Sequence, residues 1–166
     1  MSASAFFLLG SNQGDAPSYL IQARDAITRQ IGNIRKASSI YKTSAWGKTD
    51  QPDFLNQVIE VLLERNFAGS PSLLLSTLLD IEKQMGRVRI EKWGTRSIDI
   101  DILFFGNQII DDYDLQIPHP QIPFRRFTLI PLSEIAPDFI HPVLLKSTSQ
   151  LLNECVDPLE VNKMIL

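Results

Sequence analysis

The run over residues 98–105 constrains the fold of this chain more than any other stretch. It is strongly apolar, and at its start isoleucines alternate with Asp99 and Asp101. This alternation predicts a β-strand with both carboxylates on one face and the isoleucines packed on the other. Two like charges about 5 Å apart repel by about 3 kcal/mol at an effective dielectric constant near 20. The pair therefore favours a site for a cation, the alternative being an exposed strand face.

Three arginines precede this strand, on a segment that contains Gly86 and Gly94. They are Arg87, Arg89 and Arg96. Guanidinium groups match phosphate oxygens, and carboxylates without neighbouring His or Cys suit Mg²⁺, which leaves its other positions to water and substrate phosphate. The pattern favours a magnesium-dependent polyphosphate site over the simpler interpretation, a strand flanked by a charged loop.

Composition narrows the class of protein. The chain has 166 residues, 44% hydrophobic and 21% charged, which fits a single globular domain over residues 1–166. A net charge of -3 argues against nucleic-acid binding driven by overall electrostatics. The single cysteine, Cys155, excludes an internal disulfide and is expected to be a buried structural thiol. With neither a signal segment nor a long apolar stretch, we expect a cytoplasmic protein without a membrane anchor.

Hydrophobic spacing predicts the order strand, helix, strand, strand, helix, strand, followed by a less regular extension. The expected strands cover residues 5–9, 34–43, 56–63 and 98–105, and the expected helices cover residues 17–31 and 71–85. In the extension we expect a short hairpin strand at 107–110 and a short helix or turn at 127–135, with weak signals after Pro142. This order is typical of an α+β ferredoxin-like sandwich, a β-α-β-β-α-β core with a mainly antiparallel sheet and helices on one face.

Motifs spread over most of the chain point to one known family. The most specific is Arg96-Ser97-Ile98-Asp99-Ile100-Asp101 behind Gly86-Arg87-Val88-Arg89 and Trp93-Gly94. It is accompanied by Gly10-Ser11-Asn12, Tyr41-Lys42-Thr43, Asp50-Gln51-Pro52-Asp53-Phe54-Leu55-Asn56, Ile81-Glu82, Pro118-His119-Pro120 and Glu134-Ile135-Ala136-Pro137. In these segments the chain resembles the 6-hydroxymethyl-7,8-dihydropterin pyrophosphokinases of folate biosynthesis.

The resemblance implies an enzyme that transfers pyrophosphate from ATP, its co-substrate, to the hydroxymethyl oxygen of the dihydropterin and releases AMP. It implies two Mg²⁺ ions held by Asp99 and Asp101, and a catalytic set of Arg87, Arg96, Asp99 and Asp101. The implied ATP contacts are Glu82, Arg87, Arg89, Trp93, Arg96, Ile100, His119 and Arg125. The implied pterin contacts are Thr43, Ser44, Trp46, Phe54, Asn56, Asp99 and Phe127. Partners would be these small molecules, without nucleic acid or membrane, and the chain would be a monomer or weak homodimer.

Several positions depart from the family pattern. Thr95 and Ala45 replace common prolines, Leu79 replaces a frequent glutamine, and Gln121 and Pro123 replace common polar residues. We expect these departures to change details of the ATP contacts and to leave the reaction class unchanged.

Two other functions are compatible with a ferredoxin-like chain. A palm-type nucleotidyl transferase or cyclase also places two carboxylates on such a sheet, but it would release pyrophosphate. An RNA-binding or small-ligand regulatory domain would instead need aromatic residues on central strands and a basic sheet face. Taken alone, Phe54 and Phe127 would be core residues and His119 a loop residue. Their joint occurrence favours the enzyme.

Overall fold

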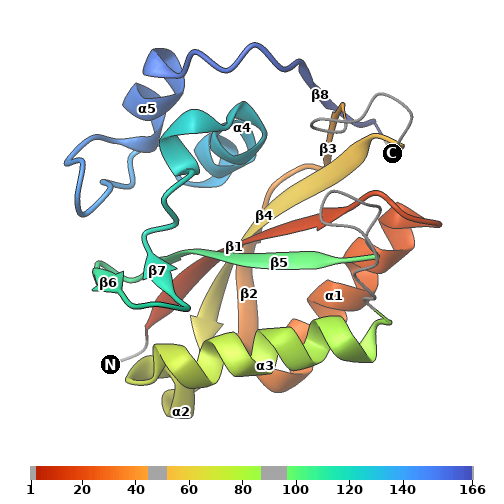
Figure 1. Cartoon of the computed structure of the whole chain (residues 1–166), viewed down its shortest axis with the longest axis vertical. Helices are drawn as coiled ribbons and strands as arrows, with labels where there is room; N and C mark the ends of the chain where they lie inside the picture. The colour runs from red at the N-terminus through yellow and green to blue at the C-terminus, as the bar shows by residue number, and fades with distance from the viewer. Residues whose placement is uncertain (1–2, 45–51, 87–96, 166) are drawn as a thin grey trace.

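The molecule is built around a six-stranded antiparallel sheet, seen in a computed structural model that describes residues 3–44, 52–86 and 97–165 (Figure 1). The strand order is β5-β1-β4-β3-β8, and β2 also pairs with β4. The strands are β1 (Ser4–Ser11), β2 (Gly32–Ala37), β3 (Tyr41–Thr43), β4 (Phe54–Leu63), β5 (Asp99–Phe105) and β8 (Val161–Lys163). The expected ferredoxin-like core is confirmed.

The predicted strand at 34–43 is wrong as a single element, because the structure divides it into β2 and β3. Ser38 lies at the break. Its hydroxyl accepts a hydrogen bond from the Val58 amide at 3.0 Å, and its carbonyl accepts one from the Gln57 side chain at 2.7 Å. The Ser38 amide still donates to the Val58 carbonyl at 2.9 Å, so a side-chain bond replaces one of the two backbone bonds at this step of the ladder. The chain rejoins β4 at Tyr41, which pairs with Asn56.

Helices α1 (Ala16–Gln30) and α3 (Pro71–Gln84) lie on the same face of the sheet (Figure 1). The Asp15 side chain caps α1 by accepting a hydrogen bond from the Ser18 amide at 3.2 Å. A short helix, α2 (Arg65–Ala68), connects β4 to α3. The apolar residues of α1 and α3 form one core with the inward side of the sheet, and this core includes Ile98, Ile100 and Ile102.

The extension covers the opposite face of the sheet with α4 (Arg126–Ile135) and α5 (Thr148–Glu154). Together they bury a second core, in which Phe6, Phe104 and Phe139 pack with ring centroids 4.6 to 6.0 Å apart. Cys155 is partly buried against this core. The sequence predicted α4 as a short helix or turn, and the structure makes it a helix.

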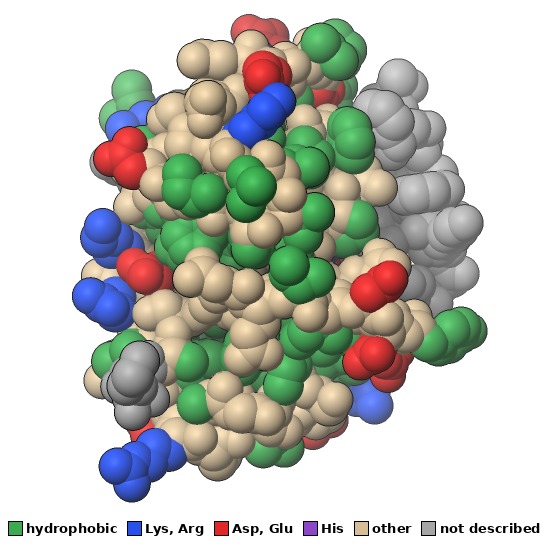
Figure 2. All heavy atoms as spheres, turned by 90° about the vertical axis from the view of Figure 1, so that its left-hand side faces the viewer, with side chains coloured by type: hydrophobic (Ala, Val, Ile, Leu, Met, Phe, Trp, Pro, Cys, Tyr) green, Lys and Arg blue, Asp and Glu red, His purple; other side chains and the backbone are tan. Residues whose placement is uncertain are grey.

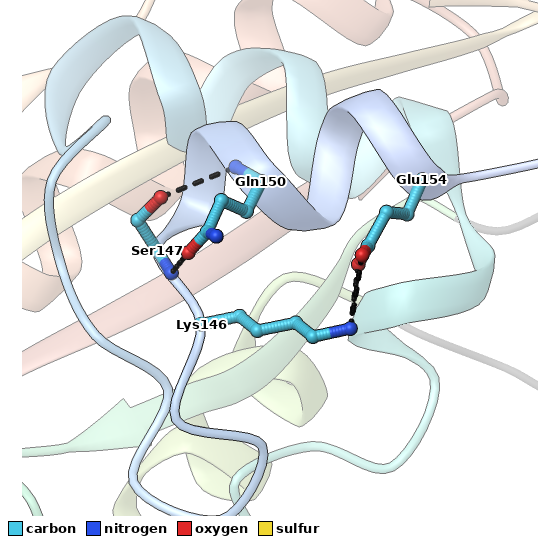
Figure 3. A network of polar contacts seen from close by, with 4 residues as sticks. All are labelled: Lys146, Ser147, Gln150 and Glu154. Atoms are coloured by element: carbon cyan, nitrogen blue, oxygen red, sulfur yellow. Dashed lines mark hydrogen bonds and ion pairs between the residues drawn. The ribbon is translucent and has the colours of Figure 1, made fainter.

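Helix α5 and strand β8 lie in the tail where we found only weak signals. The sequence does contain one signal for the start of α5, because Ser147 and Gln150 have the spacing of a capping box. The Ser147 hydroxyl accepts from the Gln150 amide at 3.2 Å, and the Gln150 side chain accepts from the Ser147 amide at 3.0 Å (Figure 3). Lys146 and Glu154 add an exposed ion pair at 2.9 Å, whose contribution to stability is small.

The hairpin strand predicted at 107–110 begins later than expected. Gly106 adopts a positive φ of 54°, and the Gln108 amide donates to the Phe105 carbonyl at 3.1 Å, so the chain turns before it pairs. The hairpin consists of β6 (Ile110–Asp111) and β7 (Gln116–Ile117), and a 3₁₀ helix, Ile122–Phe124, leads into α4.

The face on the left of Figure 1 is turned toward the viewer in Figure 2. Hydrophobic side chains there are interspersed with polar atoms, and the coloured lysines and arginines lie mainly along one border. None of the helices in the described ranges is both long and apolar enough to span a membrane.

Candidate active site

A cavity of about 1050 Å³ lies between the sheet, the start of α4 and the C-terminal segment. Among the described residues, its walls contain eight of the predicted site residues, which come from four separate parts of the chain: Thr43, Ser44, Phe54, Asn56, Asp99, Asp101, Arg125 and Phe127. The fold therefore gathers side chains that sequence reasoning could only associate by motif.

The two aspartates lie on the cavity side of β5, as the alternation predicted. Asp99 and Asp101 are half-buried, while Ile100 between them is buried in the core with α1 and α3. The described ranges contain no group of three or more His, Cys, Asp or Glu that could hold a metal ion. A pair of carboxylates at a cavity wall nevertheless fits Mg²⁺, which commonly takes one or two protein carboxylates and completes its shell with water and substrate phosphate.

Gly10 on β1 sets the spacing between the carboxylates and the neighbouring amide. It pairs with Asp99 on β5 and with Asn56 on β4, so it lies between them in the sheet. A Cβ atom at Gly10 would lie 2.8 Å from Asn56 Nδ2. The lack of a side chain at Gly10 thus makes room for the Asn56 amide in the cavity wall.

Polar groups beside aromatic rings line the part of the cavity near β3 and β4. Thr43 is 3% exposed, and its hydroxyl has no hydrogen-bond partner within the described part of the chain. Asn56 is 5% exposed and donates to the Leu9 carbonyl at 3.4 Å. With the rings of Phe54 and Phe127 in the same cavity, this wall is suited to a flat heterocycle with a hydrogen-bonding edge.

A histidine and an arginine lie within electrostatic reach of Asp101. Burial lowers the pKa of His119, with the Asp101 carboxylate raising it and Arg125 lowering it. His119 Nδ1 accepts a hydrogen bond from the Gln121 amide at 3.1 Å, so Nε2 carries the hydrogen of the neutral ring. The guanidinium of Arg125 also lies over the Phe127 ring, 5.5 Å from its centroid. The cluster thus offers a neutral donor and a cation beside the carboxylates.

Glu82 and Ile100, both predicted to contact ATP, do not line this cavity. Glu82 is 5% exposed, and its carboxylate accepts a hydrogen bond from the Ile100 amide at 2.7 Å. That amide lies between the two aspartates in the sequence, so Glu82 supports the backbone that carries them.

Of the other predicted contacts, His119 also does not line the cavity, and five lie outside the described residues. Trp46, Arg87, Arg89, Trp93 and Arg96 lie outside the described residues, as do Ala45 and Thr95, and their roles stay predictions. Of the remaining departures from the family pattern, Gln121 and Pro123 line the cavity, and Leu79 is an exposed residue of α3.

Sequence reasoning missed one wall of the cavity. It consists of residues of the C-terminal tail, namely Leu144, Lys146, Leu151, Glu154, Val156, Asp157, Pro158 and Leu159. The Ser147 capping box could have indicated α5. No local pattern indicated that the chain after α5 returns across the cavity, because that path depends on tertiary packing.

The pKa of His119 gives a direct test of this geometry. Asp101→Asn should lower that pKa further, because it removes the nearby negative charge and leaves burial and Arg125 unopposed. An NMR titration can measure it, since the chain has only two histidines. Asp99→Asn is the matched control and should shift the pKa less. A His119 pKa that is unchanged or higher in Asp101→Asn would contradict the arrangement.

Known proteins are similar to this chain in sequence and in fold. The model of the 7,8-dihydro-6-hydroxymethylpterin-pyrophosphokinase (HPPK) family matches residues 6–137. A protein of Haemophilus influenzae called 2-amino-4-hydroxy-6-hydroxymethyldihydropteridine pyrophosphokinase is 40% identical over 164 residues, covering 98% of this chain and 96% of its own length. Proteins of the same name are 39% identical in Synechocystis, covering 88% of this chain and 73% of theirs, and 40% identical in Bacillus subtilis, covering 81% and 79%.

Solved structures agree on the fold. The crystal structure of wild-type Plasmodium falciparum HPPK-DHPS with pteroate matches with a TM-score of 0.74 at 17% identity, over 93% of this chain. This chain spans 44% of that longer chain. Because the family model covers most of the sequence and a relative of nearly equal length is 40% identical, the chain belongs to the 7,8-dihydro-6-hydroxymethylpterin-pyrophosphokinase family.

Proposed function

We propose that this chain transfers pyrophosphate from ATP to 6-hydroxymethyl-7,8-dihydropterin, giving the dihydropterin pyrophosphate and AMP in folate biosynthesis. The observation that carries the proposal is the shared cavity, in which Asp99 and Asp101 lie with Phe54, Asn56 and Phe127. A carboxylate pair and a wall for a flat heterocycle are the two parts that such a transfer must bring together.

The pterin would bind against β3, β4 and the start of α4. Phe54 and Phe127 would contact its ring faces, while the Asn56 amide and the Thr43 hydroxyl would bind its polar edge. Ser44, which lines the cavity, and Trp46, which lies outside the described residues, would complete this set. The buried Thr43 hydroxyl supports the assignment, since a polar ligand atom would supply its hydrogen-bond partner.

Asp99 and Asp101 would hold two Mg²⁺ ions together with the phosphates of ATP. When bound, the ions neutralise phosphate charge and polarise the reacting oxygens. Asp99 would also lie next to the hydroxymethyl group and orient it. Glu82 would keep the backbone between these carboxylates in place through the Ile100 amide.

Cationic and hydrogen-bonding groups would bind the rest of ATP. Arg125 and the neutral Nε2–H of His119 lie beside Asp101 and would donate to phosphate oxygens. Arg87 and Arg96 would stabilise the charge that develops between the β-phosphorus and departing AMP, and Arg89 and Trp93 would contact the nucleotide. These four residues lie outside the described ranges.

We also propose a single domain over residues 1–166 that acts as a monomer or weak homodimer in the cytoplasm. The pairing of strands from both ends of the chain in one sheet supports the single domain. The lone cysteine is compatible with a reducing compartment.

The reaction product tests the proposal. With ATP, Mg²⁺ and the dihydropterin alcohol, the protein should release AMP. Asp99→Ala and Asp101→Ala should each lower turnover at least about 100-fold, because each removes metal and phosphate anchoring. Chromatography of the nucleotide products measures both effects.

Asp111→Ala is the matched control, because Asp111 is an exposed carboxylate on the β6–β7 hairpin. It should leave AMP release near that of the original protein. Pyrophosphate without AMP would contradict the proposal and favour a nucleotidyl transferase, and turnover of either Asp99→Ala or Asp101→Ala close to that of the original protein would contradict the metal assignment.

Gly10→Ala tests the position of the Asn56 amide. The added methyl group would displace the amide from the pterin wall, so the KM for the pterin should rise about 3- to 10-fold while the KM for ATP changes less. Gly69→Ala is the control, because a Cβ atom there meets nothing within 4 Å. Steady-state kinetics with each substrate varied in turn would decide, and an unchanged pterin KM in Gly10→Ala would refute this role.

A further inference from the structure

The segment over residues 155–163, here called the C-terminal strap, forms part of the cavity wall. It leaves the end of α5 and runs past α4 to β8 (Figure 1). Four consecutive residues of it line the cavity, from Val156 to Leu159. β8 then pairs with β3, with Val161 opposite Thr43. The strap lies beyond residue 137, where the family match ends.

Asp157 fastens this strap to α4. One of its carboxylate oxygens, Oδ2, accepts a hydrogen bond from the Arg126 amide at 3.1 Å, across 31 residues of sequence. The other, Oδ1, accepts from the Leu159 amide at 3.0 Å and holds the strap in a turn. Both oxygens of one side chain are therefore used, one on the helix and one on the strap.

The bond to Arg126 replaces a cap that α4 does not have locally. Arg125 is the residue before the helix, and its side chain makes no capping hydrogen bond. The first amides of a helix need acceptors, and a negative charge at this end is favourable. Asp157 supplies both from the distant strap.

The hydrogen bond from Arg126 to Asp157 also holds the two sequence neighbours of Arg126 in place. Arg125 and Phe127 both line the cavity, where the proposed function assigns them to ATP and to the pterin. Asp101 and Asp157 both act electrostatically on Arg125, so its guanidinium lies within reach of two acids. If the first turn of α4 frays, both substrate contacts move together.

We propose that Asp157 is a positioning residue of the transfer site, which holds Arg125 and Phe127 in place by capping α4 from the C-terminal strap. The proposal rests on the proposed function, because it assigns the benefit of this cap to substrate binding. It predicts an effect on the binding of both substrates, although Asp157 lies outside the motifs that identify the family.

The test is steady-state kinetics on the full chain carrying Asp157→Ala. The KM for ATP and the KM for the dihydropterin should each rise about fivefold, a factor typical of a lost helix cap, while kcat changes less than about twofold. The two KM values of Asp157→Asn should lie between those of the original protein and those of Asp157→Ala, because the single amide oxygen of asparagine can replace only one of the two carboxylate acceptors. Glu160→Ala is the matched control, since it removes an exposed carboxylate from the same strap and should leave both KM values unchanged.

Hydrogen exchange supplies a readout that does not depend on activity. A peptide covering residues 125–130 should exchange faster in Asp157→Ala than in the original protein or in Glu160→Ala. Unchanged exchange would overturn the proposal, as would unchanged KM values or a fall in kcat alone, which would indicate only loss of folded enzyme. If the original protein releases no AMP, the proposed function fails, and the exchange measurement still decides whether Asp157 orders α4.

Discussion

The antiparallel pairing of β5 with β1 is the constraint on which the rest of this structure depends. It aligns Gly10 with Asp99 and Leu8 with Asp101, and it sends the side chains of residues 99–102 alternately to the two faces of the sheet. The isoleucines enter the core with α1 and α3, and the carboxylates face the cavity. A shift of one residue in this register would bury both charges in that core, at a cost far above what a domain of this size can tolerate.

The opposite face of the sheet shows how the extension contributes to chemistry. Helices α4 and α5 bury a second core that contains Phe6 and Phe104, and this packing fixes the start of α4 over the aspartates. The cavity therefore lies between a rigid sheet and a helix end, with the C-terminal strap as its third wall. Polar groups held in this way need little reorganisation when substrate binds, which is the condition for electrostatic stabilisation of a transition state.

Local patterns in the sequence predicted the core strands, α1, α3 and the shared face of Asp99 and Asp101, because these depend on hydrophobic period and caps within a few residues. The break at Ser38 was not predictable in this way, since it depends on Gln57 and Val58 in another strand. The contacts of Glu82 with Ile100 and of Asp157 with Arg126 likewise join residues from distant parts of the sequence. Pairings over long sequence separations are decided by tertiary packing, and a single sequence does not display them.

A crystal structure with Mn²⁺, a nonhydrolysable ATP analogue and the dihydropterin alcohol would test the central claim most directly. Anomalous scattering locates Mn²⁺ independently of the refined coordinates. The account predicts cation peaks within coordination distance of the Asp99 and Asp101 carboxylates and of the phosphate chain, with the pterin between Phe54 and Phe127. A triphosphate bound elsewhere, with no cation at either carboxylate, would contradict it.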